Sequence, residues 1–314
     1  MLVEAESVTS DREHLASHPS VTSLEDLHAQ EIPAPPSPDW IICADDRVWV
    51  TGVDRGVAAY EPRSGRRLAT IPIEGDLCGA PDAGFDSVWF PTCGRPAIHR
   101  VSTATQALVA TIPIELPPAG EFTIGVGEGG VWAIVESQGG PSRLARISPV
   151  EHRLDGVFEI PQGGVSVRAG QGSIWIAYPA EDRVLRVDPR TGAVASVFAT
   201  ERGPRFLAVG KEGVWVLNQT SGSVTHIDPV SDEVVTTIAV DDGPIKGGDI
   251  AIGDGSIWVR GTKELVAEID ARTDTVVARY GAPSAGSASV AAVEGQLWIS
   301  AGAEGMLYRI DVTR

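Results

Sequence analysis

The feature that most constrains this chain is a tryptophan that recurs seven times in the same local frame. The frames read DRVWVTG, DSVWFPT, GGVWAIV, GSIWIAY, EGVWVLN, GSIWVRG and GQLWISA, and their tryptophans are Trp49, Trp89, Trp132, Trp175, Trp215, Trp258 and Trp298. Successive tryptophans lie 40, 43, 43, 40, 43 and 40 residues apart. A repeat of this regularity predicts a repeat architecture, and its period is that of a four-stranded propeller blade.

Each copy contains four short runs that are rich in β-branched residues and separated by turn residues. In the fifth copy these runs are RFLAVG, GVWVLNQ, SVTHIDP and EVVTTIAV, which we number one to four from the axis outward. Helical periodicity is absent, and this pattern is typical of antiparallel strands joined by tight turns. The predicted fold is therefore all-β, a single seven-bladed β-propeller of four-stranded antiparallel blades.

The two ends of the chain predict how the ring closes. The chain ends at YRIDVTR, a third strand without a fourth, whereas residues 28–40 resemble the passage from a fourth strand into the next first strand at ATIPIELPPAGEF. Residues 24–34 are therefore predicted to complete the last blade, because an open ring would leave blade edges exposed. The propeller domain is predicted to span 24–314, and the acidic, unpatterned residues 1–23 to be disordered.

Composition limits the partners and the compartment. The chain has 25 Lys and Arg residues against 42 Asp and Glu residues, a net charge of −17 that repels nucleic-acid phosphates and anionic lipids. No apolar run is long enough to span a bilayer, and the N-terminus lacks the basic and apolar regions of a signal peptide. The sequence thus predicts a cytoplasmic protein without nucleic-acid or membrane partners, while a protein partner stays open.

Two blocks of the chain carry a resemblance to known propellers. GSIWIAYPAEDRVLRVDPRTGAVASV and GVWVLNQTSGSVTHIDPVSDEVVTTI resemble the YVTN-type repeat and are similar to repeats of the streptogramin (virginiamycin B) lyase group. The resemblance extends from Trp40 onward. It implies a seven-bladed fold and, in the lyases, catalysis by histidines on one face with a glutamate that helps to hold a magnesium ion.

The histidines of this chain depart from that pattern. His99 and His226 fall within predicted third strands, where packing is the expected role, and the remaining histidines lie in the N-terminal segment or in a turn on the opposite face. No catalytic histidine can be carried over to a residue of this chain. A divalent cation such as magnesium is implied by the resemblance alone, with Glu121, Glu136 and Asp249 as the available oxygen ligands.

Blade geometry gives the disc two faces. Turns between strands one and two, and between three and four, lie on one face, which we call the turn face. Loops between strands two and three, and from strand four to the next strand one, lie on the other, the loop face. By analogy with other propellers, we expect a ligand at the channel mouth on the loop face.

The innermost strands carry the departures from the repeat. Counting back seven residues from each tryptophan gives Ile42, Asp82, Gly125, Arg168, Ala208, Ala251 and Ala291. Small or apolar residues are expected where seven strands crowd around an axis, so Asp82 and Arg168 stand out. Either they satisfy each other near the channel, or they hold a polar ligand, or the alignment slips locally and both are exposed.

Counting back nine residues gives positions near the predicted mouth: Trp40, Ala80, Thr123, Ser166, Phe206, Asp249 and Ser289. Trp40 and Phe206 are predicted either to stack on a flat ligand or to plug the ring, and Asp249 to accept hydrogen bonds. Neighbouring loops and strand ends add further polar candidates for the same mouth, namely Glu121, Arg205, Lys246, Cys93, Glu136, Tyr178, Asn218, Gln219 and Arg260. Their fixed cations favour an anionic small molecule.

Two classes of function follow from this set. In the first, a lyase or isomerase acts on a small molecule, with Asp249 or Glu121 as base and Arg168, Arg205 or Arg260 stabilising developing negative charge. In the second, the same residues hold a ligand or protein partner without turnover, as in a non-catalytic scaffold. The missing histidines favour binding, and the polar departures clustered on one face favour a functional site of some kind. Of the two classes we favour a small-molecule site, with lyase-type activity as an option.

The cysteines are considered separately. Cys78 and Cys93 flank the predicted first hairpin of the second blade, so we expect them to lie within bridging distance. In a reducing cytoplasm the two would instead be thiols, and neither has a histidine base beside it. Cys43, within the apolar run WIIC, is expected to be a small buried hydrophobe.

Overall fold

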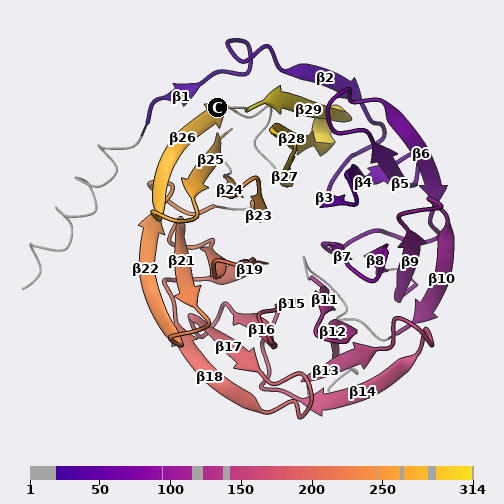
Figure 1. Cartoon of the computed structure of the whole chain (residues 1–314), viewed down its shortest axis with the longest axis vertical. Coiled ribbons are helices and arrows are strands. Elements are labelled where there is room, and N and C mark those ends of the chain that lie inside the picture. Colours follow the sequence, from indigo (N-terminus) through magenta and orange to yellow (C-terminus); the bar gives the residue numbers. More distant parts are fainter. Residues whose placement is uncertain are drawn as a thin grey trace, which may run out of the picture.

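Seven blades surround a central axis in the computed structural model (Figure 1). The structure describes residues 19–93, 95–114, 123–136, 142–245, 247–261, 265–281 and 288–312. Within these ranges the only helical element is a single 3-10 turn, η1 (Gly302–Glu304). The predicted fold class is therefore confirmed.

The blades follow one another along the chain, and the strands of each blade run in order from the axis outward. Blade 1 contains β3 (Ile41–Ala44), β4 (Arg47–Val53), β5 (Gly56–Tyr60) and β6 (Arg67–Pro72). Blade 2 contains β7 (Asp82–Ala83), β8 (Ser87–Thr92), β9 (Ala97–Ser102) and β10 (Leu108–Pro113). Blade 3 contains β11 (Gly125–Gly127), β12 (Gly130–Glu136), β13 (Ser142–Ile147) and β14 (Leu154–Glu159).

The remaining blades repeat the arrangement. Blade 4 contains β15 (Ser166–Gly170), β16 (Ser173–Tyr178), β17 (Arg183–Val187) and β18 (Val194–Ala199). Blade 5 contains β19 (Pro204–Val209), β20 (Val214–Asn218), β21 (Ser223–Asp228) and β22 (Glu233–Ala239). Blade 6 contains β23 (Asp249–Gly253), β24 (Ser256–Arg260), β25 (Leu265–Asp270) and β26 (Thr275–Gly281), and blade 7 contains β27 (Val290–Val293), β28 (Gln296–Ala301), β29 (Met306–Asp311) and β2 (Gln30–Pro33).

The repeat tryptophans hold neighbouring blades together. All seven lie on second strands and are at most 1% exposed. Each packs against the second strand of the next blade, as Trp132 does against Ile174 and Ile176. Because a blade cannot bury its own faces, this contact supplies much of its core.

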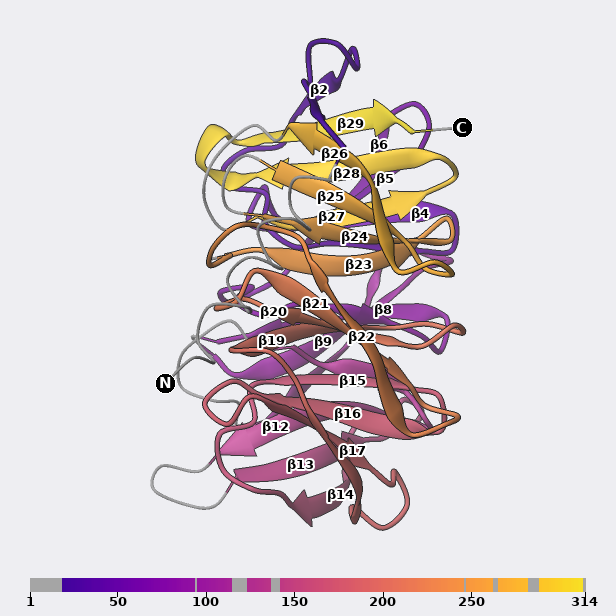
Figure 2. The same ribbon diagram turned by 90° about the vertical axis from the view of Figure 1, so that its left-hand side faces the viewer.

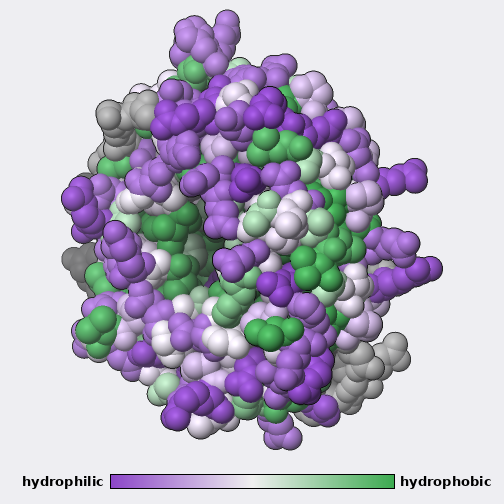
Figure 3. Space-filling model, turned by 45° about the vertical axis from the view of Figure 1, so that its right-hand side comes forward, coloured by the Kyte–Doolittle hydropathy of each residue, from purple (hydrophilic) through white to green (hydrophobic). Residues whose placement is uncertain are grey.

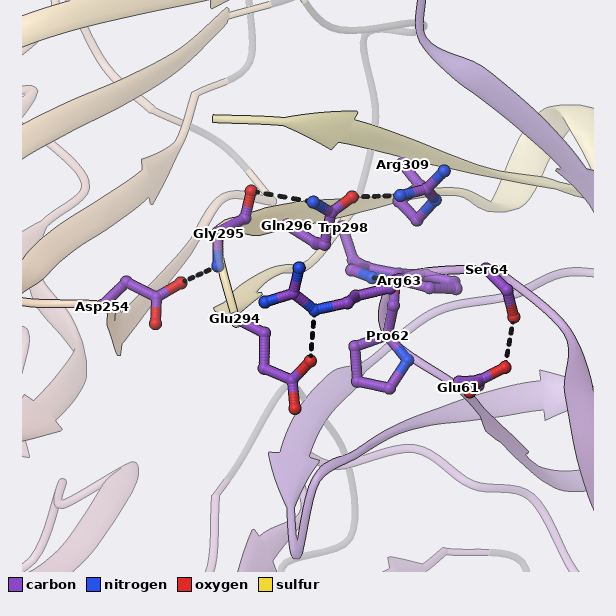
Figure 4. Close-up of polar contacts among 10 residues, drawn as sticks. All are labelled: Glu61, Pro62, Arg63, Ser64, Asp254, Glu294, Gly295, Gln296, Trp298 and Arg309. Atoms are coloured by element: carbon purple, nitrogen blue, oxygen red, sulfur yellow. Dashed lines mark hydrogen bonds and ion pairs between the residues drawn. The ribbon is translucent and has the colours of Figure 1, made fainter. Parts of the chain in front are cut away.

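The seam between the last and the first blade has the same construction. Trp298 packs with Val48 and Val50 of blade 1, and its Nε1 donates to the carbonyl of Pro62 at 3.3 Å (Figure 4). Arg63 forms an ion pair with Glu294 across this seam, with Nε 2.9 Å from Oε2. The ring therefore closes with a contact like those between its other blades.

The N-terminal strand completes the last blade, as predicted. β2 pairs antiparallel with β29, in a register that places Gln30 opposite Arg309 and Pro33 opposite Met306. Ile32 is 8% exposed and belongs to the same apolar cluster as Trp298. Ring closure thus joins segments from the two ends of the chain.

A second N-terminal strand was not foreseen from the sequence. β1 (Val21–Thr22) pairs parallel with β26, which gives blade 6 a fifth strand at its outer edge (Figure 1). Leu24 and Leu27, in the turn that follows, pack against the core shared by blades 6 and 7. Residues 1–18 of the segment predicted to be disordered lie outside the described residues.

Closure can be tested with nested deletions. Removing residues 1–20 should leave the melting temperature nearly unchanged, because both N-terminal strands remain. Removing 1–35 should lower it sharply, since loss of the buried Ile32 side chain alone costs on the order of 2–5 kcal/mol. Removing 1–24, which deletes β1 but keeps β2, separates the two strands. Equal melting temperatures for the shortest and longest deletions would contradict this account of closure.

Candidate functional site

The first strands hold the register that the tryptophan spacing predicted. The residue seven positions before each tryptophan lies directly opposite it in the ladder between strands one and two, as shown by Ile42, Asp82, Gly125, Arg168, Ala208, Ala251 and Ala291. The alignment does not slip in any blade. Asp82 and Arg168 therefore occupy innermost positions that other blades give to small or apolar residues.

A cavity lies on the axis between these strands. Its volume is about 310 Å³, and Figure 3 shows it as a hollow with apolar residues along its wall. Four of the predicted site residues line it: Trp40, Asp82, Arg168 and Asp249. The structure thus brings together part of the predicted site, inside the channel.

Trp40 and Phe206 meet across the channel. Their ring centroids are 5.5 Å apart at an interplanar angle of 71°, although they belong to blades 1 and 5, which are not neighbours. Trp40 is 4% exposed and Phe206 is 1% exposed. The two rings pack edge to face against each other, as expected if they plug the ring. Both lie at the loop-face end of the first strands.

Asp82 of blade 2 and Arg168 of blade 4 both bind the backbone of blade 3, which lies between them. Asp82 Oδ2 accepts a hydrogen bond from Val126 N at 2.7 Å, and Arg168 Nη1 donates to Ile124 O at 2.6 Å. Burial raises the pKa of Asp82, and the nearby Arg168 guanidinium partly opposes that rise. Asp82 thus satisfies a backbone group of β11 and Arg168 one of the residue that precedes it, and no further strand can pair either group.

Asp249 is the more deeply buried carboxylate, at 6% exposure. Its Oδ1 accepts Ile250 N at 2.8 Å, and its Oδ2 accepts the Ser289 hydroxyl at 2.5 Å. Burial raises its pKa to about 6, although these hydrogen bonds and the Arg168 charge act in the opposite direction. The charge of Arg168 thus acts to lower the pKa of both carboxylates, against the effect of burial.

Two residues that line the cavity, Trp40 and Arg168, have hydrogen-bond donors that the described part of the chain leaves unused. Trp40 Nε1 is buried and has no acceptor among the described residues. Within the described residues, Arg168 donates hydrogen bonds only through Nη1, to Ile124 O and Val167 O. A buried donor without an acceptor is costly, so these groups favour a polar ligand or ordered water in the cavity.

Other predicted site residues lie away from the cavity. Tyr178, Asn218 and Arg260 are fully buried, and Phe206 nearly so. Tyr178 donates to Pro161 O at 3.0 Å, and Asn218 Nδ2 donates to Thr225 Oγ1 at 2.8 Å. The guanidinium of Arg205 lies 5.8 Å from the Phe206 ring, and Gln219 Nε2 donates to Gly248 O at 3.4 Å. None of them lines the cavity.

The remaining three candidates fall wholly or partly outside the described residues. Glu121 and Lys246 lie outside the described residues, as does the side chain of Glu136. Among described residues, no group of three or more His, Cys, Asp or Glu side chains could hold a metal ion. Asp249 is the one proposed magnesium ligand with a described side chain, and its two oxygens accept hydrogen bonds from Ile250 N and the Ser289 hydroxyl. The divalent cation stays a prediction.

The histidines have structural partners. His99 lies between the hydroxyls of Thr92 and Thr111, each 3.1 Å from a ring nitrogen. His226 stacks on Trp215 with centroids 4.5 Å apart and contacts Asp274 Oδ2 at 2.9 Å. Both belong to third strands, so their predicted packing role is confirmed.

Cys78 and Cys93 form a disulfide, with Cα atoms 5.8 Å apart. The expectation that they lie within bridging distance is confirmed, and Cys93 is not available as a thiol. Cys43 lines the cavity instead, and burial raises its pKa to about 12, which disfavours the reactive thiolate.

The comparisons with known proteins support the fold. The chain is similar to a streptogramin B lyase structure, with 14% identity and a TM-score of 0.72 over 91% of this chain and 97% of the other. It is also similar to the WD40 domain of Neurospora crassa Pan2 (10% identity, TM-score 0.68, 90% and 94% covered) and to the computationally designed protein Ika8 (8%, 0.62, 89% and 98%). No protein-family model and no curated protein sequence matches.

These likenesses make the chain a streptogramin lyase-like propeller at the level of fold. In the described part of the chain, no helix is both long enough and apolar enough to cross a membrane. The cytoplasmic location stays a prediction, and the disulfide is more typical of oxidising compartments.

The disulfide gives a direct chemical test. Alkylation of the unfolded, unreduced protein should label one cysteine, and alkylation after reduction should label all three. The Cys43→Ser variant, as control, should take up no label and then two. Cys93→Ser should lower stability by about 3 kcal/mol, because the bridge closes a short loop. Three labels without reductant would show that the bridge is absent.

The raised pKa of Asp249 predicts a pH dependence of stability. Between its ordinary pKa of 3.8 and the folded value of about 6, the folded state binds more protons than the unfolded state. Stability therefore falls as pH rises through this window. Relative to Asp249→Asn, the wild-type free energy of unfolding should fall by roughly 3 kcal/mol between about pH 4 and pH 7, measured by urea denaturation. A difference that stays constant with pH would refute the assignment.

Proposed function

We propose that this chain is a small-molecule-binding propeller whose ligand occupies the axial cavity. Arg168 meets an anionic or carbonyl group of the ligand through its Nε and Nη2 atoms. Trp40 Nε1 donates a second hydrogen bond, and the carboxylates of Asp82 and Asp249 provide acceptors. The ligand is small, because the cavity holds about 310 Å³.

One observation carries this proposal. Two of the seven innermost positions hold charged residues, and both line a cavity with Asp249 and Trp40. The indole N–H of Trp40 lacks an acceptor in the described residues. Asp82 and Arg168 use only some of their hydrogen-bonding atoms to bind the backbone at Val126 and Ile124. Their remaining hydrogen-bonding capacity is available to a ligand. Polar groups that converge on a concave cavity are typical of ligand sites.

The test is a thermal-shift screen of small carboxylates, amino acids and amines, followed by calorimetry on any hit. Arg168→Gln should weaken binding by about tenfold or more, because a charge-assisted hydrogen bond contributes about 1.5–3 kcal/mol. Arg205→Gln is the matched control, since it removes an arginine that does not line the cavity. Equal binding by wild type and both variants would show that the ligand lies elsewhere.

A second candidate is lyase or isomerase activity in the same cavity. The observation that favours it is the pKa of Asp249, which at about 6 suits a general base near neutral pH. Asp249 would remove a proton from the ligand, and Arg168 would stabilise the negative charge that develops. A hit that is consumed by wild type but only bound by Asp249→Asn supports this activity. A hit recovered unchanged supports binding alone.

A further inference from the structure

The turns between first and second strands form a ring at one end of the channel. Neighbouring turns contact each other directly: Glu128 Oε1 accepts Gly172 N at 2.9 Å, and Asp254 Oδ2 accepts Gly295 N at 2.8 Å (Figure 4). We call this set the turn ring, and it consists of residues 45–46, 84–86, 128–129, 171–172, 210–213, 254–255 and 294–295.

The turn ring is acidic. It carries seven carboxylates, Asp45, Asp46, Asp86, Glu128, Glu212, Asp254 and Glu294, and a single lysine, Lys211. Three arginines touch it from outside: Arg47 and Arg100 donate to the carbonyls of Asp45 and Phe85, and Arg63 pairs with Glu294. Carboxylates therefore outnumber the cations around this end of the channel.

Turn geometry and packing explain only some of these acids. Glu128 and Asp254 hold adjacent turns, and Glu294 forms the seam ion pair. The described residues supply no hydrogen bond or ion pair to the exposed carboxylates of Asp46 and Asp86. Their negative charges therefore contribute to the electrostatic potential at this end of the channel.

The cavity extends toward the turn ring. Its lining continues from Trp40 and Asp249 to Cys43, Ala169 and Ile252, which lie beside the turns. Trp40 and Phe206 fill the opposite, loop-face end of the first strands. In Figure 2, β29 runs toward the C-terminus at the right. β27 runs in the same direction, because both strands pair antiparallel with β28. The turn that follows β27 belongs to the turn ring, so the turn ring lies on the right-hand side of Figure 2.

That side faces the viewer in Figure 1, and Figure 3, turned by 45°, still looks into the hollow. The ligand face expected from the sequence was the loop face, whereas the hollow opens on the turn face. The charge of the turn ring also reaches the wall, because Asp254 helps to raise the pKa of Cys43.

We propose that the ligand of this cavity carries a cationic group, an amine in the simplest case, and enters through the acidic turn ring. Inside, the cation meets Asp249 and Asp82 and contacts the Trp40 ring, a favoured partner of cations. A ligand that also has a carboxylate places it at Arg168. This inference rests on the proposed function, in which Arg168 meets an anionic or carbonyl group, and adds a cationic group to the same ligand.

An isosteric series tests the charge of the ligand. Butylammonium, 4-aminobutyrate and butyrate share a chain length and differ in their charged ends. We expect the two amines to raise the melting temperature and butyrate to have no effect. Butyrate binding as tightly as butylammonium, or no effect of either amine, overturns the proposal. A screening hit that lacks a cation but depends on Arg168 would refute this inference and leave the proposed function standing.

Paired variants test the route. Asp46→Asn with Asp86→Asn removes two charges and suits the positive φ of both turns, since asparagine tolerates that conformation. Glu74→Gln with Glu201→Gln is the control, from loops on the loop face. At low salt the first pair should reduce the association rate of an amine about three- to tenfold, and the difference should vanish near 0.5 M salt. Equal rates for the two pairs would rule out entry through the turn ring.

Discussion

The structure depends on one constraint, which is that no blade can bury its own faces. Each repeat tryptophan solves this for one side by packing against the second strand of the next blade, as Trp132 does against Ile174. All blade faces are buried only if the last blade packs against the first. Trp298 makes this contact with Val48 and Val50. Pairing of β2 with β29 then covers the outer edge that the C-terminal strand leaves.

The same constraint creates the channel and its chemistry. A closed ring leaves seven inner strand edges facing the axis, with backbone groups that no further strand can pair. Asp82 binds such a group on β11, and Arg168 binds one on Ile124, which precedes β11. Asp249 accepts a hydrogen bond from the Ser289 hydroxyl in the next blade. Polar side chains on the axis therefore stabilise the ring and supply a candidate site at once.

How far the sequence could predict this molecule depends on range. Register between first and second strands follows from a fixed seven-residue offset, so the positions of Asp82 and Arg168 were predictable. The meeting of Trp40 with Phe206 across non-adjacent blades was not, because no local pattern encodes it. Arg260 and Tyr178 lie at strand ends, a position that predicts exposure at the mouth, but packing between blades buries both side chains completely. Each acid of the turn ring is an ordinary turn residue in its own repeat. Their common position around one opening depends on the closed ring, so no local pattern predicts it.

Closure by distant segments also sets an order of events during synthesis. Gln30 leaves the ribosome early, and its partner Arg309 follows 279 residues later. Through that interval β2 has no strand to pair with, and a nascent chain with an unpaired strand is open to the wrong partners. Pro33 lacks a backbone donor, and Pro35 and Pro36 follow at once. These prolines make the waiting strand a poor template for other chains until the last blade emerges.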